Sequence, residues 1–331
     1  MSILYNQPES SITSSTRSKG IDLDDRWAII LTNGDRLPLN SVVPASRRGQ
    51  RPKHFCRTAG SDFVINKTRR EVSLAFAPGK TMFVVSENHL SYCEEVLEDV
   101  PRRNIIVEPQ DDGTLFAILY SLLRLRKTNP EAVVTFFPAD FDPPEAKNFM
   151  ARVEAAQDAV RQRPNLILLG IEPASPDENR EWIEPDLSSP MGDHLNVWRV
   201  RDFREKVSRS EAHELMKRGG LWNSSVMVGT IATFLRKIRR AAPEIYESFI
   251  AAESKIGTPD EHLSMRRIYY GNFADTDFSR DVLAKSADKL AVIPVPTAKV
   301  RGIGVKPPVA AESPESAMIA LKSMAAAAGW F

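Results

Sequence analysis

Two segments near the start of the chain contain residue types that bind phosphate groups. Residues 33–39 (NGDRLPL) form a turn-like sequence containing Arg36, and residues 51–55 (RPKHF) contain Lys53. Backbone N–H groups of a small-residue turn can approach phosphate oxygens, and a nearby arginine and lysine neutralise the negative charge. The combination fits a nucleoside triphosphate. A turn with scattered basic residues gives the same pattern, so these segments alone leave both interpretations open.

Other catalytic motifs are incomplete. His213-Glu214 begins like the metal-binding helix of a zinc protease, but Lys217 stands where the second histidine is required. Residues 79–81 (GKT) resemble the end of a P-loop, but Leu74 replaces its first glycine and an apolar run follows the motif directly. The chain has no G-x-S-x-G sequence. These departures argue against a zinc protease, a P-loop enzyme and an α/β-hydrolase.

Apolar runs alternate with amphipathic segments in the first half of the chain. Runs of the kind buried in parallel sheets are found at 27–31, 81–85, 104–107, 132–137 and 165–169. Between them, residues 113–126 and 145–161 carry apolar side chains at helical spacing. This alternation predicts an α/β fold with a doubly wound, mostly parallel sheet.

The pattern changes after about residue 172. Residues 172–193 are rich in Pro, Asp and Ser, which predicts a long loop or an excursion from the sheet. Further strands are predicted near 195–200, 225–228 and 290–294, and further helices near 210–218, 231–240 and 243–253. We predict a disordered arm at 1–25, one domain over 26–306, and a Pro- and Ala-rich tail at 307–331.

Composition excludes several classes of protein. The 331 residues include 44 Lys and Arg against 43 Asp and Glu, a net charge of +1, which argues against a non-specific nucleic-acid or membrane-surface binder. Cys56 and Cys93 form no C-x-x-C pair, so neither a disulfide framework nor a cysteine zinc site is expected. No apolar run approaches the ~20 residues of a spanning helix, and no signal peptide is recognisable. We therefore expect a cytoplasmic protein.

A series of short motifs follows the chain in a fixed order. After the two basic segments come 108–109 (EP), 113–114 (GT), 137–140 (FPAD), 182–185 (WIEP), 204–206 (REK), 221–224 (LWNS), 278–279 (FS) and 290–294 (LAVIP). Over residues 26–296 this order resembles the mannose-1-phosphate guanylyltransferases, which are sugar-phosphate nucleotidyltransferases. The resemblance implies a Rossmann-like sheet of the nucleotide-diphospho-sugar transferase type. It also implies nucleotidyl transfer from GTP to mannose 1-phosphate, giving GDP-mannose and pyrophosphate, with Mg²⁺ and a possible homo-oligomer.

The resemblance assigns roles to individual residues. Catalysis falls to Arg36, which would clamp the triphosphate, and to Lys53, which would neutralise the phosphates under attack. The remaining roles are nucleotide binding by Gly34, Glu108, Gly113 and Thr114, sugar-phosphate binding by Glu205, Lys206 and Asn223, and magnesium binding by Asp140. Arg36 and Asp140 follow strands predicted to be parallel, so both are expected to converge with Lys53 at the carboxyl edge of the sheet.

The same residue types also have ordinary structural roles. Asp140 could form a helix cap or a turn, Glu205 and Lys206 could be solvated charges, and Asn223 could form a turn. These readings remain open beside the functional ones.

The sequence departs from the family pattern at several positions. Residues 31–33 (LTN) replace the leading glycines of the first loop, and Phe141 replaces a histidine after Asp140. Arg180-Glu181 replaces a Tyr-Gly pair, which places a carboxylate near the expected sugar site. A late magnesium-binding aspartate has no counterpart, because no acidic residue lies between Val295 and Glu312. Two hypotheses follow: an active guanylyltransferase, or an impaired homologue that binds a nucleotide or a protein partner in a regulatory role.

Overall fold

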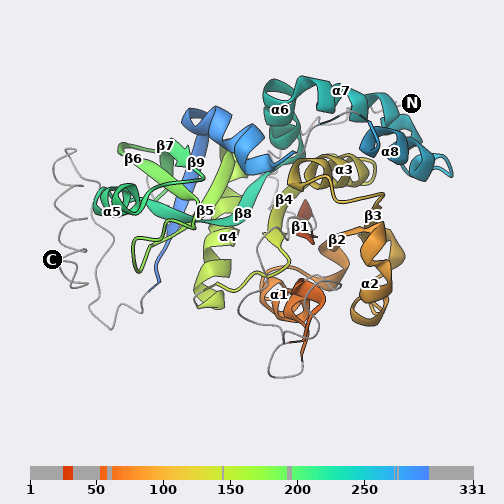
Figure 1. Ribbon diagram of the computed structural model, residues 1–331, viewed down its shortest axis with the longest axis horizontal. Coiled ribbons are helices and arrows are strands. Elements are labelled where there is room, and N and C mark those ends of the chain that lie inside the picture. Colours follow the sequence, from red (N-terminus) through yellow and green to blue (C-terminus); the bar gives the residue numbers. More distant parts are fainter. Residues whose placement is uncertain are drawn as a thin grey trace, which may run out of the picture.

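The chain folds around one mixed sheet. The computed structural model describes residues 25–32, 53–57, 62–143, 145–191, 196–271, 273 and 276–297. Within these residues nine strands lie in the order β3-β2-β1-β4-β8-β5-β9-β7-β6 (Figure 1). Their bounds are β1 (Arg26–Leu31), β2 (Thr81–Ser86), β3 (Ile105–Glu108), β4 (Val133–Pro138), β5 (Leu166–Ile171), β6 (Trp182–Pro190), β7 (Trp198–Arg204), β8 (Leu221–Thr230) and β9 (Leu290–Val295).

The first four strands form a parallel half that is buried on both faces. Strands β3, β2, β1 and β4 all run in the same direction. Along β1 the side chains alternate between two cores, with Ile29 and Leu31 on one face and Ala28 and Ile30 on the other. A parallel strand covered on both faces needs a continuous apolar run, as found in β1. The parallel strands with a core on each face confirm the prediction of an α/β fold.

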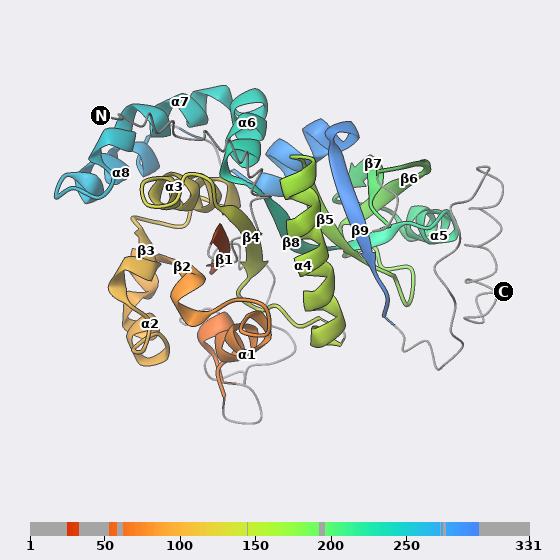
Figure 2. The ribbon, with the colours of Figure 1, turned by 180° about the vertical axis from the view of Figure 1, so that it is seen from behind.

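Helices form a layer on each face of this sheet. One layer consists of α3 (Thr114–Arg126), α6 (Ile231–Ala241), α7 (Pro243–Ala252) and α8 (Glu261–Tyr269). The other consists of α1 (Val64–Val72), α2 (Leu90–Val96) and α4 (Ala146–Gln162), as Figure 2 shows from behind. Helix α3 is buried along most of its length because it lies between the sheet and the helices α6 and α7.

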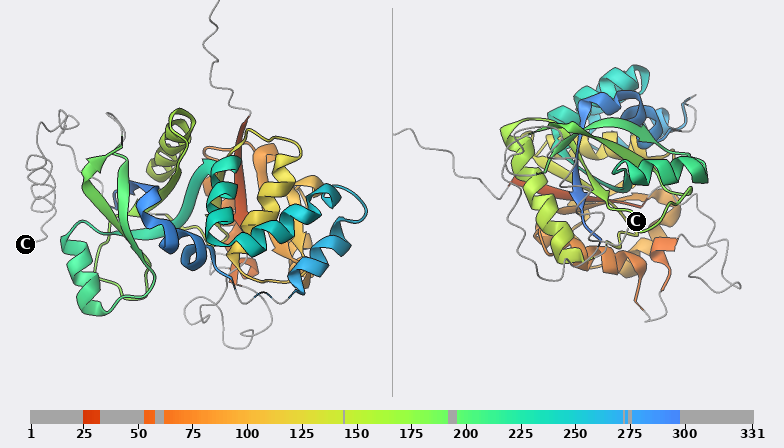
Figure 3. Two further views of the ribbon diagram at one scale, coloured as in Figure 1. Left: turned by 90° about the horizontal axis from the view of Figure 1, so that it is seen from above. Right: turned by 90° about the vertical axis from the view of Figure 1, so that its left-hand side faces the viewer.

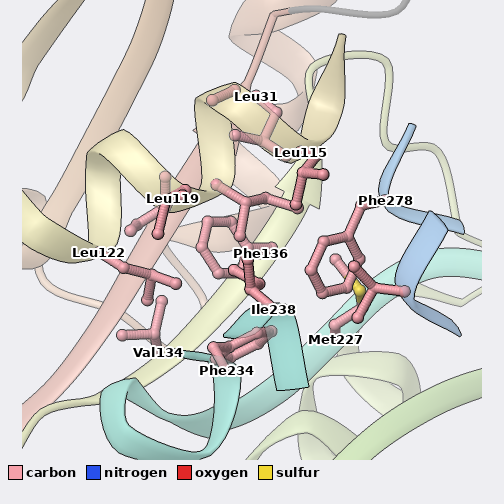
Figure 4. Close-up of a cluster of buried hydrophobic side chains, with 14 of the residues drawn as sticks. Leu31, Leu115, Leu119, Leu122, Val134, Phe136, Met227, Phe234, Ile238 and Phe278 are labelled. Atoms are coloured by element: carbon pink, nitrogen blue, oxygen red, sulfur yellow. The ribbon is translucent and has the colours of Figure 1, made fainter. Parts of the chain in front are cut away.

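A cluster of aromatic rings joins the parallel half to the later part of the chain. The ring of Phe136 in β4 packs edge-on against Phe234 in α6, with centroids 5.1 Å apart. Phe278 lies 6.2 Å from Phe234 and packs into the same core (Figure 4). This buried ring anchors the chain around residue 278 next to the start of α3.

The second half of the sheet corrects the prediction of a mostly parallel sheet. Strand β8 runs antiparallel to β4 and β5, while β6 is antiparallel to both β7 and β8. Strand β9 pairs in parallel with β5 and antiparallel with β7, so β8, β5, β9, β7 and β6 close a small ring of strands. Only four of the nine described pairings are parallel. Apolar runs indicate burial but do not specify strand direction, which explains the error.

Strand β6 lies in the segment predicted as a loop or an excursion. It contains Pro185 and Pro190, and its register with β7 shifts at both positions. Proline lacks the N–H of a regular ladder and is tolerated in strands mainly at bulges and edges. The composition of this segment therefore concealed a bulged strand.

Helix α5 (Arg209–Lys217) covers the outer end of the ring of strands, far from α7 and α8 (Figure 3). Its start has a complete capping box between Ser208 and Glu211, and a small core of Trp182, Val207, Ala212 and Leu215 lies beneath it.

Among the helices described, none has both the length and the apolar character needed to cross a membrane. The predicted arm (1–25) and tail (307–331) lie outside the described residues except for Asp25. The domain boundaries therefore stay predictions.

Candidate functional site

Two of the residues predicted to form the site, Asp140 and Asn223, lie at one edge of the sheet. Leu31 pairs with Pro138 at the ends of β1 and β4, and the backbone N–H of Ala139 donates to the Leu31 carbonyl at 2.9 Å. Strand β8 runs the other way, so its beginning lies at this same edge, where Asn223 pairs with Gly170 near the end of β5. Ligands of open α/β sheets bind outside the carboxyl ends of the strands. Asp140 and Asn223 therefore follow the topology expected of a ligand site.

The loop that carries Asp140 is held against α1. The hydroxyl of Thr68 in α1 donates to the carbonyl of Ala139 at 2.7 Å, and Lys67 forms an ion pair with Asp142. Asp140 itself is exposed at the end of β4. The fold thus fixes the backbone on both sides of this carboxylate while its side chain reaches solvent.

The convergence of Arg36, Lys53 and Asp140 stays a prediction. Gly34 and Arg36 lie outside the described residues. For Lys53 the structure describes the backbone, which begins a short 3₁₀ helix (Lys53–Phe55) whose Phe55 is fully buried. Strand β1 ends at Leu31, directly beside the start of the Asp140 loop.

Asp140 is a candidate ligand for magnesium. Within the described part of the chain, no group of three or more His, Cys, Asp or Glu residues is arranged to hold a metal ion. Magnesium bound with a nucleotide is often held by one or two carboxylates, with phosphates and waters supplying the other ligands. Asp140 alone fits that limited role.

The segment predicted to line the nucleotide pocket packs against the chain after α8. Glu108 is fully buried and accepts a hydrogen bond from the hydroxyl of Tyr269. Burial first, and the carboxylate of Glu108 second, raise the pKa of this tyrosine well above its usual value. Gln110 also contacts Tyr269, because its side-chain amide donates to the backbone carbonyl of Tyr269 at 3.1 Å.

Gly113 and Thr114 are closed over by residues 276–278. The hydroxyl of Thr276 donates to the carbonyl of Asp112 at 2.7 Å. The hydroxyl of Thr114 donates to Asp277 at 3.1 Å and accepts from the backbone N–H of Phe278 at 2.9 Å. These contacts, which we call the 276–278 clasp, use both the donor and an acceptor position of the Thr114 hydroxyl. The clasp therefore lies against Gly113 and Thr114, while Glu108 is held by Tyr269.

The predicted sugar-phosphate residues meet where three strands are in register. Trp182 of β6 pairs with Arg204 of β7 and with Trp222 of β8, and both pairings are antiparallel. One position further along this register, Glu181 therefore lies between Glu205 and Asn223. Asn223 is 8% exposed. Its side-chain amide donates to the Glu181 carboxylate at 2.6 Å, and its side-chain carbonyl accepts from the backbone N–H of Ser225 at 3.1 Å. Lys206 is exposed beside this group.

This row of residues is acidic. Burial raises the pKa of Glu181, and the charges of Asp277 and Glu205 raise it further, although hydrogen bonds from Asn223 and Ser279 act in the opposite direction. Burial also raises the pKa of Glu205, and Asp277 again contributes. Oxygen Oε1 of Glu205 has no hydrogen-bond partner among the residues that the structure describes. The geometry therefore gathers carboxylates at a position that the resemblance assigns to a phosphate-bearing ligand.

Comparison with curated proteins identifies the relatives of the chain. It is 26% identical over 277 residues to mannose-1-phosphate guanylyltransferase 2 of Escherichia coli O157:H7, covering 78% of this chain and 56% of that protein. It is 25% identical over 226 residues to the alginate biosynthesis protein AlgA of Pseudomonas fluorescens, covering 67% of this chain and 45% of that protein. At this low identity the chain resembles the mannose-1-phosphate guanylyltransferases as a divergent relative. It spans about half the length of these relatives, and no family model matches it.

Solved structures with similar folds agree with this resemblance at the level of the fold. A structure described as mannose-1-phosphate geranyltransferase from Thermus thermophilus superposes with a TM-score of 0.69 at 19% identity, covering 82% of this chain and 74% of the other. A structure described as mannose-6-phosphate isomerase from Helicobacter pylori has a TM-score of 0.60 at 20% identity, covering 82% of this chain and 97% of the other. At such identities these similarities concern the fold alone.

For several residues near the site, no feature of the neighbouring sequence indicates their contacts. Tyr269 and Thr276 contact residues about 160 positions earlier, and nothing in their own neighbourhoods indicates those partners. Asp277 and Asp281 are carboxylates of the kind that could replace the missing late aspartate, but both are engaged in protein contacts. Asp277 accepts from Thr114, and Asp281 forms ion pairs with Arg280 and Lys285. Glu181 was detectable as a departure from the family pattern.

Proposed function

We propose that the chain transfers a nucleotidyl group from GTP to mannose 1-phosphate, forming GDP-mannose and releasing pyrophosphate. The observation that carries this proposal is the 26% identity to a mannose-1-phosphate guanylyltransferase over 78% of the chain. The convergence of β4, β5 and β8 at one sheet edge supports it, because Asp140 and Asn223 both lie at that edge.

The proposed mechanism relies on positioning and on charge neutralisation. The phosphate of the sugar attacks the α-phosphorus of GTP in line with the leaving pyrophosphate, and no covalent intermediate with the protein is required. Arg36 and Lys53 would neutralise the triphosphate, while Glu205, Lys206 and Asn223 would hold the sugar phosphate. Magnesium supplied with the nucleotide would offset the phosphate charges, with Asp140 as its protein ligand.

A second candidate function is nucleotide or partner binding without efficient turnover. Three observations favour it: the engagement of Asn223 by Glu181, the clasp over Thr114, and the engagement of Asp277 and Asp281 in contacts elsewhere. Removing a single electrostatic stabiliser of a transition state typically lowers kcat ~10²–10³-fold. We therefore propose that any transfer is slow, with a turnover number below ~1 s⁻¹.

The deciding experiment measures pyrophosphate release from GTP and mannose 1-phosphate at saturating magnesium. Release that is slow but lost in Asp140→Asn supports transfer. Calorimetric binding of GTP and magnesium, or of GDP-mannose, without release supports the second function instead. A protein that neither releases pyrophosphate nor binds either nucleotide contradicts both.

Two further properties belong to the same proposal. Cys56 and Cys93 are both buried and not disulfide-bonded, which is consistent with a reducing, cytoplasmic location. Homo-oligomerisation is also proposed from the resemblance, and sedimentation of the full chain would test it.

A further inference from the structure

The carboxylate of Glu181 accepts hydrogen bonds from the donor groups next to the proposed sugar-phosphate position. One oxygen of its carboxylate accepts from the side-chain amide of Asn223 at 2.6 Å and from the hydroxyl of Ser279 at 3.3 Å. The side-chain carbonyl of Asn223 is already bonded to the backbone of Ser225. An amide and a hydroxyl are the donors that a sugar hydroxyl or a phosphate would use, and here both are directed at a protein carboxylate.

The fold holds Glu181 in this place. Its own carbonyl accepts from the backbone N–H of Asn223 at 2.9 Å. The next residue, Trp182, is fully buried, and its ring N–H donates to the carbonyl of Asp177 at 2.9 Å. These contacts fix the backbone of Glu181 at the start of β6, which places its carboxylate within hydrogen-bonding distance of Asn223.

The charges around Glu181 oppose an anionic ligand. Asp277 and Glu205 both interact electrostatically with Glu181, so the carboxylate that accepts from Asn223 lies among further negative charges. Lys206 and Arg280 are the cations that act on Glu205. A sugar 1-phosphate carries further negative charge, and placing like charges together is how proteins exclude a ligand.

We propose that Glu181 is a specificity-determining residue that lowers the affinity for sugar 1-phosphates at the position beside Glu205 and Asn223. It does so by taking the donors of Asn223 and Ser279 and by adding a negative charge. This inference rests on the proposed function, because that function places the sugar phosphate at Glu205, Lys206 and Asn223. The hydrogen bonds that hold the 276–278 clasp do not involve Glu181, so nucleotide binding should be unaffected by its substitution.

The test titrates mannose 1-phosphate calorimetrically into the full chain and three variants. Glu181→Ala removes the carboxylate and frees the donors, and we expect at least a tenfold gain in affinity. Glu181→Gln removes the charge but keeps the side-chain volume and an acceptor, so a smaller gain is expected. Glu178→Ala is the matched control, because it removes an exposed carboxylate from the same loop, and its affinity should equal that of the wild type.

A second comparison asks whether the gain depends on Asn223. In the Glu181→Ala background, Asn223→Ala should abolish the gain, because the freed amide donor is then absent. The inference is overturned if neither Glu181 variant binds mannose 1-phosphate more tightly than the wild type, or if Glu178→Ala gains as much. If Glu181→Ala does not fold, as judged by circular dichroism, the result for Glu181→Gln decides.

Titration of GTP and magnesium into the same variants separates this inference from the proposed function. GTP binding in all variants without a gain in sugar-phosphate affinity overturns the role of Glu181 alone. A gain in sugar-phosphate affinity without GTP binding supports that role and contradicts the nucleotidyltransferase proposal.

Discussion

A methyl group at Gly113 would collide with the backbone of the 276–278 clasp. Gly113 has φ +95°, a conformation that L side chains rarely adopt, and a Cβ atom built there lies 1.7 Å from the carbonyl oxygen of Thr276. Ordinary contact between non-bonded heavy atoms needs roughly 3.5 Å, so the two segments would have to separate by about 1.5–2 Å. Gly113→Ala is therefore expected to open the clasp and to destabilise the fold.

The loss of stability has two parts. A left-handed conformation costs an alanine ~1–2 kcal/mol. Separation of the segments breaks the hydrogen bond from Thr276 to Asp112 and weakens that from Phe278 to Thr114, at about 1 kcal/mol each. The total is ~3–4 kcal/mol, a large fraction of the ~5–15 kcal/mol by which domains are stable. At ~2–4 °C per kcal/mol for a larger domain, Tm should fall by roughly 6–16 °C.

Thermal and urea unfolding of Gly113→Ala and Gly257→Ala provide the assay. Gly257 has φ +83°, but a Cβ atom there has nothing within 4 Å, so this control carries the backbone strain without the collision. It should lose only ~1–2 kcal/mol. Equal destabilisation of the two variants would refute the reasoning, because the clasp would then contribute nothing.

Three other substitutions test separate parts of the fold. Tyr269→Phe removes a hydroxyl donor from the buried Glu108 and should lower the unfolding free energy by ~1–3 kcal/mol in urea titrations; no change would show that other partners suffice. Burial lowers the pKa of Lys237 to about 8, whereas an unfolded lysine keeps its proton up to ~10.4, so wild-type stability should gain from this group as the pH rises from 8 to 10. In Lys237→Met that contribution should vanish, and identical Tm–pH curves for the two proteins would contradict the assignment. Ser208→Ala removes the capping box shared with Glu211 and should lower the unfolding free energy by about 1 kcal/mol. An unchanged Tm in calorimetric melting would disprove this expectation.

The sequence alone determined most of the elements and the family that the chain resembles. The apolar run 27–31 became β1 (Arg26–Leu31), and the amphipathic segment 113–126 became α3 (Thr114–Arg126). Both are local properties, because burial on two faces requires a continuous apolar strand and burial on one side requires helical spacing. The ordered motifs also led to the mannose-1-phosphate guanylyltransferases, which the curated relatives confirm. The functional roles of the predicted site residues, from Gly34 to Asn223, are still predictions.

Only the tertiary structure decided strand direction and the partners of the site residues. Strand β8 reverses against β4, and β6 pairs within a segment whose prolines indicated a loop. Likewise, Glu108 meets Tyr269 across 161 positions of sequence, and Glu181 meets Asn223 across 42. A sequence pattern shows which side chains must be buried or charged, since those are properties of each residue. Which groups become neighbours depends on how distant strands pack, and that packing turned a predicted sugar-phosphate ligand, Asn223, into the partner of a carboxylate.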